Sequence, residues 1–181
     1  MNNFDIVIVG AGSAGCILAN KLINNTNYNI LLIEAGPKDS SPIIHVPLGY
    51  GMTFYNKKIN WNFYSEKQNT LNNREIYYPR GKVLGGSSSI NGMVYARGVK
   101  SDYENWHMSS ELSLENIINS FKEIEQPVDS SSSLLSLNKI PVNDVSEEHN
   151  PILRYFFDGC HEMGIPFNKN LNTELNDQIG H

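Results

Sequence analysis

The stretch FDIVIVGAGSAGCILANKL, residues 4–22, contains the clearest indication of the fold in this sequence. Phe4 to Val9 is a short apolar run, which predicts a strand of the kind buried on both faces of a parallel sheet. The glycine-rich turn Gly10–Gly15 follows at once. Apolar residues then recur at helical spacing from Ala14 to Leu22, before a break at Asn24-Asn25. The stretch therefore predicts a strand, a tight turn and a helix in immediate succession.

A second predicted strand, Ile30 to Ile33, completes a βαβ unit, which is right-handed by the general rule. The G-x-G-x-x-G pattern of Gly10–Gly15 is by itself a weak sign of dinucleotide binding. Here it has the expected context, and Glu34 follows 24 residues after Gly10, near the ~20 expected for an acid that hydrogen-bonds a ribose hydroxyl. An acid at this position disfavours NADP, whereas NAD and FAD both stay open.

Each glycine of the turn has a predicted role. Gly10 permits the tight turn, Gly12 lets the backbone reach a pyrophosphate, and Gly15 lets the helix and strand pack closely. The N-terminus of the helix supplies backbone N–H groups and a partial positive charge for the phosphates. A glycine-rich turn without a ligand is the alternative.

A second glycine-rich stretch, GKVLGGSSSINGMVYARG, occupies residues 81–98. A flexible Gly/Ser linker is usually polar on both sides. This stretch is instead entered by Val83 and Leu84 and left by apolar residues from Ile90 onward. It predicts a buried loop whose small residues let the main chain approach a ligand. The preceding residues 37–80 are rich in aromatic and turn-forming residues, which predicts a long ordered excursion with short strands.

Two further helices are predicted in the second half of the chain. The first covers Leu114 to Ile124, with Ser113 as N-cap and Pro127 as the stop. The second begins with Asn150 as N-cap and Pro151 as first helical residue, and it ends at Gly164 and Pro166. The polar, serine-rich residues 129–133 between them predict a linker.

The composition narrows the functional class. The chain has 181 residues, of which 40% are hydrophobic, and a formal net charge of −5. No basic stripe is present, so nucleic acid is not an expected partner. Cys16 and Cys160 fall in different predicted helices, which favours a reducing compartment, the cytoplasm, over a disulfide framework. The apolar run Ile6 to Val9 is too short for a signal peptide or a membrane span.

The second glycine-rich stretch resembles the signature of the glucose–methanol–choline oxidoreductases, flavoenzymes that oxidise alcohols, and the agreement runs on to Glu104. Val-Leu-Gly-Gly-Ser-Ser followed by Asn-Gly is a far more specific pattern than the first motif. Other matching pieces follow in the family's order: Ile33 to Gly36, Trp61 to Phe63, Tyr78 to Gly81, and Phe167 to Asn172. The resemblance covers essentially the whole chain and is greatest to the choline dehydrogenase-like branch.

This resemblance implies an α/β fold: a Rossmann-like, FAD-binding βαβ unit with a parallel sheet that is incomplete in this chain. Residues 1–128 would form the FAD-binding region and residues 129–133 a linker. Residues 134–181 would form the beginning of a substrate-binding region. FAD is the expected cofactor.

The resemblance also assigns cofactor-binding residues, in three groups. The first turn contributes Gly10, Gly12, Ser13, Ala14 and Gly15, with Ser13 and Ala14 at the pyrophosphate. Glu34 and Ala35 lie at the adenosine ribose. The rest of the cofactor runs along Val83, Gly86, Ser87, Asn91, Gly92, Met93 and Val94. Two alternatives stay open: Val83 and Val94 could be core residues, and Asn91 could be a turn residue.

Two departures from the family pattern shape the expected chemistry. Some members attach the flavin covalently through a histidine where this chain has Ile90, so non-covalent FAD is expected here. Family members are also much longer, and their catalytic histidine lies near the far C-terminus. None of the five histidines of this chain matches it, and they show no metal-ligand spacing. No catalytic residue or metal site is therefore predicted.

The resulting functional prediction is the FAD-binding part of an oxidoreductase that acts on the CH–OH group of a small-molecule alcohol. By itself the chain is expected to be inactive. Its uncovered sheet would favour self-association or pairing with a missing C-terminal part. A hydroxynitrile lyase on the same scaffold and a non-enzymatic flavin-binding module are the alternatives.

Overall fold

The structure is a computed structural model that describes residues 3–104, 106, 112–128, 139–143, 150–168, 170–172 and 179–180. The chain divides into two compact units, Met1–Val94 and Tyr95–His181, which are considered separately. The predicted linker, residues 129–133, lies outside the described residues. The division into residues 1–128 and 134–181 therefore stays a prediction.

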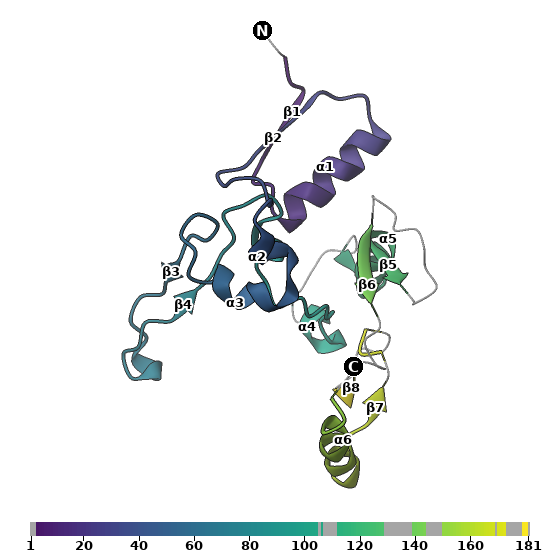
Figure 1. Ribbon diagram of the computed structural model, residues 1–181. Coiled ribbons are helices and arrows are strands. Elements are labelled where there is room, and N and C mark those ends of the chain that lie inside the picture. Colours follow the sequence, from purple (N-terminus) through teal and green to yellow (C-terminus); the bar gives the residue numbers. More distant parts are fainter. Residues whose placement is uncertain are drawn as a thin grey trace. The chain divides into compact units, whose positions relative to one another are not determined.

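The first unit opens with the predicted βαβ element (Figure 1). Strand β1 (Ile6–Val9) leads into helix α1 (Ser13–Asn25), and strand β2 (Ile30–Ile33) then pairs with β1. The pairing is parallel, with Ile6 opposite Ile30 and Val9 opposite Ile33. Strand β1 begins two residues later than predicted, and just before it the Asp5 carboxylate accepts a hydrogen bond from the backbone of Asn29 (2.8 Å). The predicted α/β fold class is confirmed.

Burial of β1 on both faces, which its composition predicted, does not occur in this unit. Ile8 is buried beside Gly15 of α1, whereas Val7 is exposed and Val9 is 82% exposed. Alternate side chains of a strand point to opposite faces, so α1 covers one face of the pair and the other is open. A second covering layer is what would bury Val7 and Val9.

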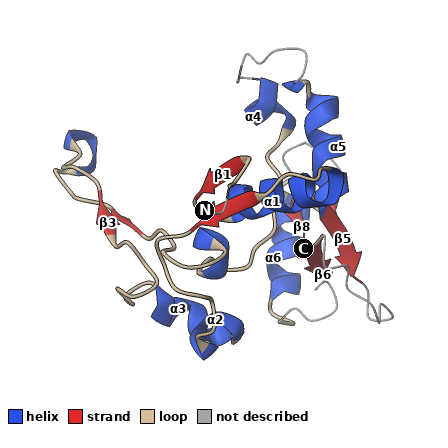
Figure 2. Ribbon diagram, turned by 90° about the horizontal axis from the view of Figure 1, so that it is seen from above, coloured by secondary structure: helices blue, strands red, loops and turns tan. Residues whose placement is uncertain are grey.

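Residues 37–80 form the predicted excursion of short elements. In chain order these are α2 (Pro42–His45), η1 (Pro47–Gly49), α3 (Tyr50–Thr53), β3 (Phe63–Tyr64), η2 (Asn69–Leu71) and β4 (Tyr77–Tyr78). Strands β3 and β4 pair antiparallel, and long loops join them to the rest of the unit (Figure 2). The buried Asn60 side chain fixes this excursion: it donates to the carbonyl of Phe54 (2.9 Å) and accepts from the backbone of Arg80 (3.0 Å).

The described residues of the second unit form four elements before residue 150 and three after it. In chain order the described elements are α4 (Lys100–Glu104), α5 (Leu114–Ile124), β5 (Glu125–Val128), β6 (Ile140–Asn143), α6 (Leu153–Glu162), β7 (Phe167–Asn168) and β8 (Ile179–Gly180). Strands β5 and β6 pair parallel, as do β7 and β8.

Helix α5 confirms its predicted bounds and its cap, because the Ser113 hydroxyl accepts a hydrogen bond from the backbone of Asn116 (3.3 Å). Helix α6 starts later than predicted. Asn150 accepts from the backbone of Ile152 (3.0 Å) and so stabilises a turn before the helix, whose N-cap is Ile152. The end of α6 near Gly164 is confirmed, and Gly164 has a φ of +76°.

A buried polar network joins three segments of the second unit. The Arg97 guanidinium makes a two-pronged ion pair with the Glu125 carboxylate, and the Tyr95 hydroxyl donates to the same carboxylate (2.6 Å). Arg97 also donates to the backbone carbonyl of Asn172 (2.8 Å). The side chains of Arg97 and Glu125 are only 12% and 9% exposed. Such a pair is strongly coupled to folding, because losing one partner leaves a buried charge uncompensated.

This network predicts acid sensitivity of the second unit. Burial raises the pKa of Glu125, but the hydrogen bonds from Arg97 and Tyr95 outweigh it, and the pKa lies below its ordinary value of 4.5. The ionised pair therefore contributes stability that is present above pH 4.5 and is lost as the pH falls further. We expect the urea midpoint to decline in this acid range. Glu125→Gln should flatten the decline, and an unchanged profile would contradict the role of Glu125.

Candidate cofactor-binding site

The first glycine turn has the geometry that its sequence predicted. Gly10 has a φ of +97°, which favours glycine, and a Cβ on Gly15 would overlap the carbonyl oxygen of Gly10. Gly12 differs from both, since a Cβ there would meet only the Cα of Gly86, at 4.0 Å. Gly10 and Gly15 thus shape the turn, while Gly12 borders open space.

The N-terminus of α1 is available to an anion. Gly12 is the N-cap residue, no side chain caps the helix, and its first turn holds no acidic residue. The first N–H groups of a helix need external acceptors and carry a partial positive charge. Ser13 and Ala14 lie in this first turn and are exposed. These features suit a phosphate or diphosphate, whose binding at this turn stays a prediction.

Glu34 has a structural role that sequence reasoning missed. One of its carboxylate oxygens accepts a hydrogen bond from the backbone of Ala11 (2.9 Å), and the other accepts from the backbone of Gly36 (2.9 Å). The side chain therefore ties the end of β2 to the first turn. An ionised carboxylate has about four acceptor positions, so Glu34 keeps capacity for a ribose hydroxyl. Ala35, beside it, is exposed.

The second glycine-rich loop packs directly on the first turn. The backbone of Gly85 donates to the carbonyl of Ala11 (2.8 Å), and a Cβ on Gly86 would lie 2.7 Å from the Cα of Gly12. Gly86 also has a φ of +60°. The loop continues as the short helix η3 (Gly86–Ser89). The two motifs, Gly10–Gly15 and residues 81–98, are thus brought together in space.

Three glycines that sequence reasoning left unassigned also allow this packing. Gly85 has a φ of +89°, a Cβ on Gly36 would overlap the carbonyl of Lys82, and one on Gly81 would overlap the carbonyl of Gly86. The signal for them was available, because each lies in a motif of the resemblance. Which glycine touches the ligand and which touches the protein is set by the tertiary contacts.

The side chains of Val83 and Ser87 both contact other parts of the first unit, although Val83 is buried and Ser87 is exposed. The Val83 side chain is 0% exposed and lies in a core cluster with Ile59 and Ile90. Val83 is therefore a core residue, which was one of the two interpretations of its sequence position. Any contact of Val83 with a cofactor would involve its backbone. The Ser87 hydroxyl accepts a hydrogen bond from the backbone of Gly81 (3.1 Å) and so fixes the loop.

Asn91 to Val94 form the exposed end of the loop. The Asn91 side chain accepts a hydrogen bond from the backbone of Met93 (2.9 Å), and Met93 has a φ of +62°. Asn91 is therefore a turn residue, which was the alternative interpretation of its sequence position. Val94 is 84% exposed, so it is not a core residue of this unit. Among the described residues, no hydrogen bond or ion pair joins this group to the first turn, and its role toward a cofactor stays a prediction.

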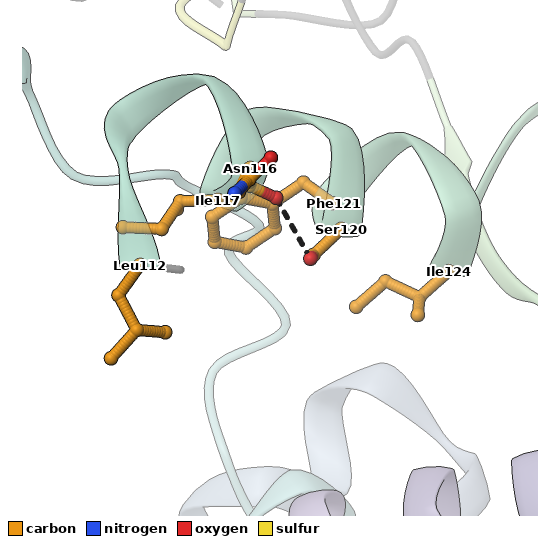
Figure 3. Close-up of a pocket in the computed structure, with 6 residues that line it drawn as sticks. All are labelled: Leu112, Asn116, Ile117, Ser120, Phe121 and Ile124. Carbon is orange, nitrogen blue, oxygen red and sulfur yellow. Dashed lines mark hydrogen bonds between the residues drawn. The ribbon is translucent and has the colours of Figure 1, made fainter. Parts of the chain in front are cut away.

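The second unit contains a groove of its own. It is an apolar groove of about 270 Å³ along α5, lined by Leu112, Asn116, Ile117, Ser120, Phe121 and Ile124 (Figure 3). The Ser120 hydroxyl donates to the backbone carbonyl of Asn116 (2.8 Å), so this polar group is already satisfied. None of the predicted site residues lines the groove. The candidate site is therefore the pair of glycine-rich loops.

The candidate site combines backbone donors, a helix N-terminus and one acidic side chain, which are groups suited to holding a ligand. Among the residues that the structure describes, no cluster of three or more His, Cys, Asp or Glu side chains could hold a metal ion.

None of the helices formed by the described residues has both the length and the hydropathy that a membrane crossing requires.

Comparison with known proteins identifies the class. The family model described as GMC oxidoreductase matches residues 4–181. The chain is 40% identical to an alcohol dehydrogenase [acceptor] of Pseudomonas putida and 35% identical to an oxygen-dependent choline dehydrogenase of Vibrio vulnificus, in each case over 98% of this chain. The fold is similar to pyridoxine 4-oxidase from Mesorbium loti, with a TM-score of 0.80 and 29% identity over 92% of this chain.

The chain belongs to the GMC oxidoreductase family, because the family model matches nearly all of its length. This confirms the resemblance and implies FAD as the cofactor. The chain covers 33% of the Pseudomonas putida relative, 32% of the Vibrio vulnificus relative and 33% of the pyridoxine 4-oxidase chain. It thus spans about a third of the length of the proteins that it matches.

Proposed function

We propose that this chain binds FAD non-covalently and forms the FAD-binding part of an enzyme that oxidises the CH–OH group of an alcohol. The observation that carries the proposal is the packing of the second loop on the first turn, through Gly85 and Gly86. This packing places two ligand-binding motifs of the family beside the uncapped N-terminus of α1. The alcohol and choline dehydrogenases among the relatives support an alcohol as substrate.

The structure fits the diphosphate part of FAD. Gly12 borders open space, where a Cβ would meet nothing closer than 4.0 Å. The backbone N–H groups of Ser13 and Ala14 are positioned to hold phosphate oxygens, and Glu34 to accept from the ribose. Asn91 to Val94 would follow the rest of the cofactor. The chemistry that bound FAD supplies is acceptance of a hydride from the alcohol carbon.

The residues of this chain would position the cofactor, and the proton of the alcohol would be removed by a base elsewhere in the complete enzyme. General-base catalysis typically contributes ~10²–10⁴-fold. The two free cysteines, Cys16 and Cys160, fit a reducing compartment, and we include a cytoplasmic location in the proposal.

Alcohol-dependent dye reduction tests the enzymatic part of this proposal. The 181-residue chain is compared with the same chain joined to the remaining part of the Pseudomonas putida relative, each loaded with FAD. We expect oxidation of primary alcohols or choline only by the joined protein. FAD-dependent oxidation by the 181-residue chain would contradict the proposal that the catalytic base lies outside this chain. A joined protein that is folded and holds FAD but oxidises neither substrate class would contradict the proposed reaction.

The non-covalent state of the flavin is a separate prediction. Ile90 is buried with Ile59 and Val83, and its hydrocarbon side chain cannot form a bond to the flavin. Acid precipitation of an FAD-loaded sample should therefore leave the yellow colour in the supernatant. Ile90→Val, which keeps the core apolar, should behave in the same way. Colour that remains in the washed pellet would contradict this prediction.

A further inference from the structure

The sequence contains a single Asn-Gly pair, Asn91-Gly92, at the end of the second glycine-rich loop. Both residues are exposed. A Cβ on Gly92 would meet only the ring of Tyr50, at 3.9 Å, so little surrounds its backbone. Because glycine has no side chain, its own peptide nitrogen, which directly follows Asn91, has the greatest conformational freedom and the least shielding. The backbone nitrogen of Gly92 is therefore accessible enough to react with the side chain of Asn91.

The hydrogen bonding around Asn91 favours this reaction. Its Oδ1 accepts a hydrogen bond from the backbone of Met93 (2.9 Å). Attack of the Gly92 nitrogen on Cγ of Asn91 would place negative charge on Oδ1, and a donor aimed at that atom stabilises such charge. No described residue accepts a hydrogen bond from the N–H of Gly92, so this nitrogen is not held by a competing partner.

We propose that Asn91 is a site of spontaneous deamidation and that bound FAD suppresses it. The Gly92 nitrogen forms a bond to Cγ of Asn91, the bond from Cγ to Nδ2 breaks, and the Gly92 proton leaves with the amide nitrogen as ammonia. Water then opens the cyclic imide and yields aspartate or isoaspartate. No oxidant, reductant or enzyme is required.

The protective effect of FAD rests on the proposed function, which places Asn91 along the cofactor. A bound ligand that contacts Asn91 would hold its side chain and exclude the water that opens the imide. Once formed, the new carboxylate would add a negative charge to a loop that serves an anionic cofactor. Deamidation should therefore also weaken FAD retention in aged protein.

Peptide mapping by mass spectrometry tests this inference on the full 181-residue chain, incubated at mildly alkaline pH with and without saturating FAD. Asn73, which is exposed and precedes Arg74, serves as an internal control. We expect Asn91 to convert while Asn73 stays an amide. Gly92→Ala should slow conversion by at least about tenfold, because a side chain shields the attacking nitrogen. This variant fits the structure, since its Cβ makes only an ordinary contact with Tyr50.

The outcomes separate this inference from the proposed function. Conversion of Asn91 that is slowed by FAD supports both parts of the inference. Absence of conversion at Asn91, or conversion equal to that at Asn73, overturns it. Equal conversion with and without FAD, in samples where retained flavin shows that FAD is bound, overturns the protective part. Conversion in a chain that retains no FAD supports the modification site and counts against the proposed function.

Discussion

Gly12→Val is expected to abolish retention of FAD by this chain while leaving the fold in place. The backbone of Gly12 (φ −80°, ψ −170°) is extended and suits any residue, and a Cβ there meets only the Cα of Gly86 at 4.0 Å. The branched side chain would therefore project into the space proposed for the pyrophosphate. We expect FAD affinity to fall by at least about a hundredfold, or ~2.7 kcal/mol. Absorbance of flavin that remains with the protein after gel filtration measures this loss.

The matched control is Gly159→Val, at an exposed glycine of α6 that also has open space around it. It should retain FAD like the parent chain. Far-ultraviolet circular dichroism should show that both variants are folded. We expect Gly12→Val to lower the free energy of unfolding by about 1 kcal/mol, because valine is a poor N-cap residue. Equal flavin retention by Gly12→Val and the parent would reject the assignment of the first turn to the pyrophosphate.

Arg97→Ala is expected to cause the largest loss of stability in the second unit. Among the described residues, the substitution leaves the buried Glu125 carboxylate with the Tyr95 hydroxyl as its remaining hydrogen-bond donor. Removing one partner of a buried ion pair typically costs ~3–5 kcal/mol. Of the two tryptophans in the sequence, Trp61 belongs to the first unit and Trp106 to the second. Urea unfolding followed by Trp106 fluorescence in a Trp61→Phe background therefore reports on this unit.

Two variants control for this prediction. Arg154→Ala removes an exposed pair with Asp158 (3.9 Å) and should change stability by less than about 1 kcal/mol. The double substitution Arg97→Met with Glu125→Leu should recover much of the loss, because no unpaired charge is left buried. A loss from Arg97→Ala no greater than that from Arg154→Ala would show that the network contributes little.

The local elements could be predicted because their causes are local. Strand β2 and helix α5 have the predicted bounds, since apolar periodicity and the Ser113 cap are written in adjacent residues. Helix α6 was predicted to start too early, because Asn150 can cap either a helix or an isolated turn. The sequence predicted that Val9 is buried, whereas it is exposed. An apolar strand indicates that both of its faces can be covered, but it does not indicate whether the covering elements belong to the same unit.

The candidate site likewise has some features that could be predicted from the sequence and others that could not. The roles of Gly10 and Gly15 follow from a motif whose backbone geometry is fixed, and the structure confirms both. The two hydrogen bonds of Glu34 to Ala11 and Gly36 could not be predicted, because they depend on how the end of β2 meets the first turn. The burial of Val83 likewise depends on Ile59, a residue from a distant segment. Residues from distant segments make these contacts, so spacing along the chain does not reveal them.

Titration of the 181-residue chain with FAD, monitored by flavin fluorescence and compared with NAD and NADP, tests whether the two glycine-rich loops form an FAD site. We expect saturable binding of one FAD per chain, with neither nicotinamide cofactor competing for the site. Absence of saturable FAD binding by a chain that circular dichroism shows to be folded, or displacement of FAD by NAD, would contradict it.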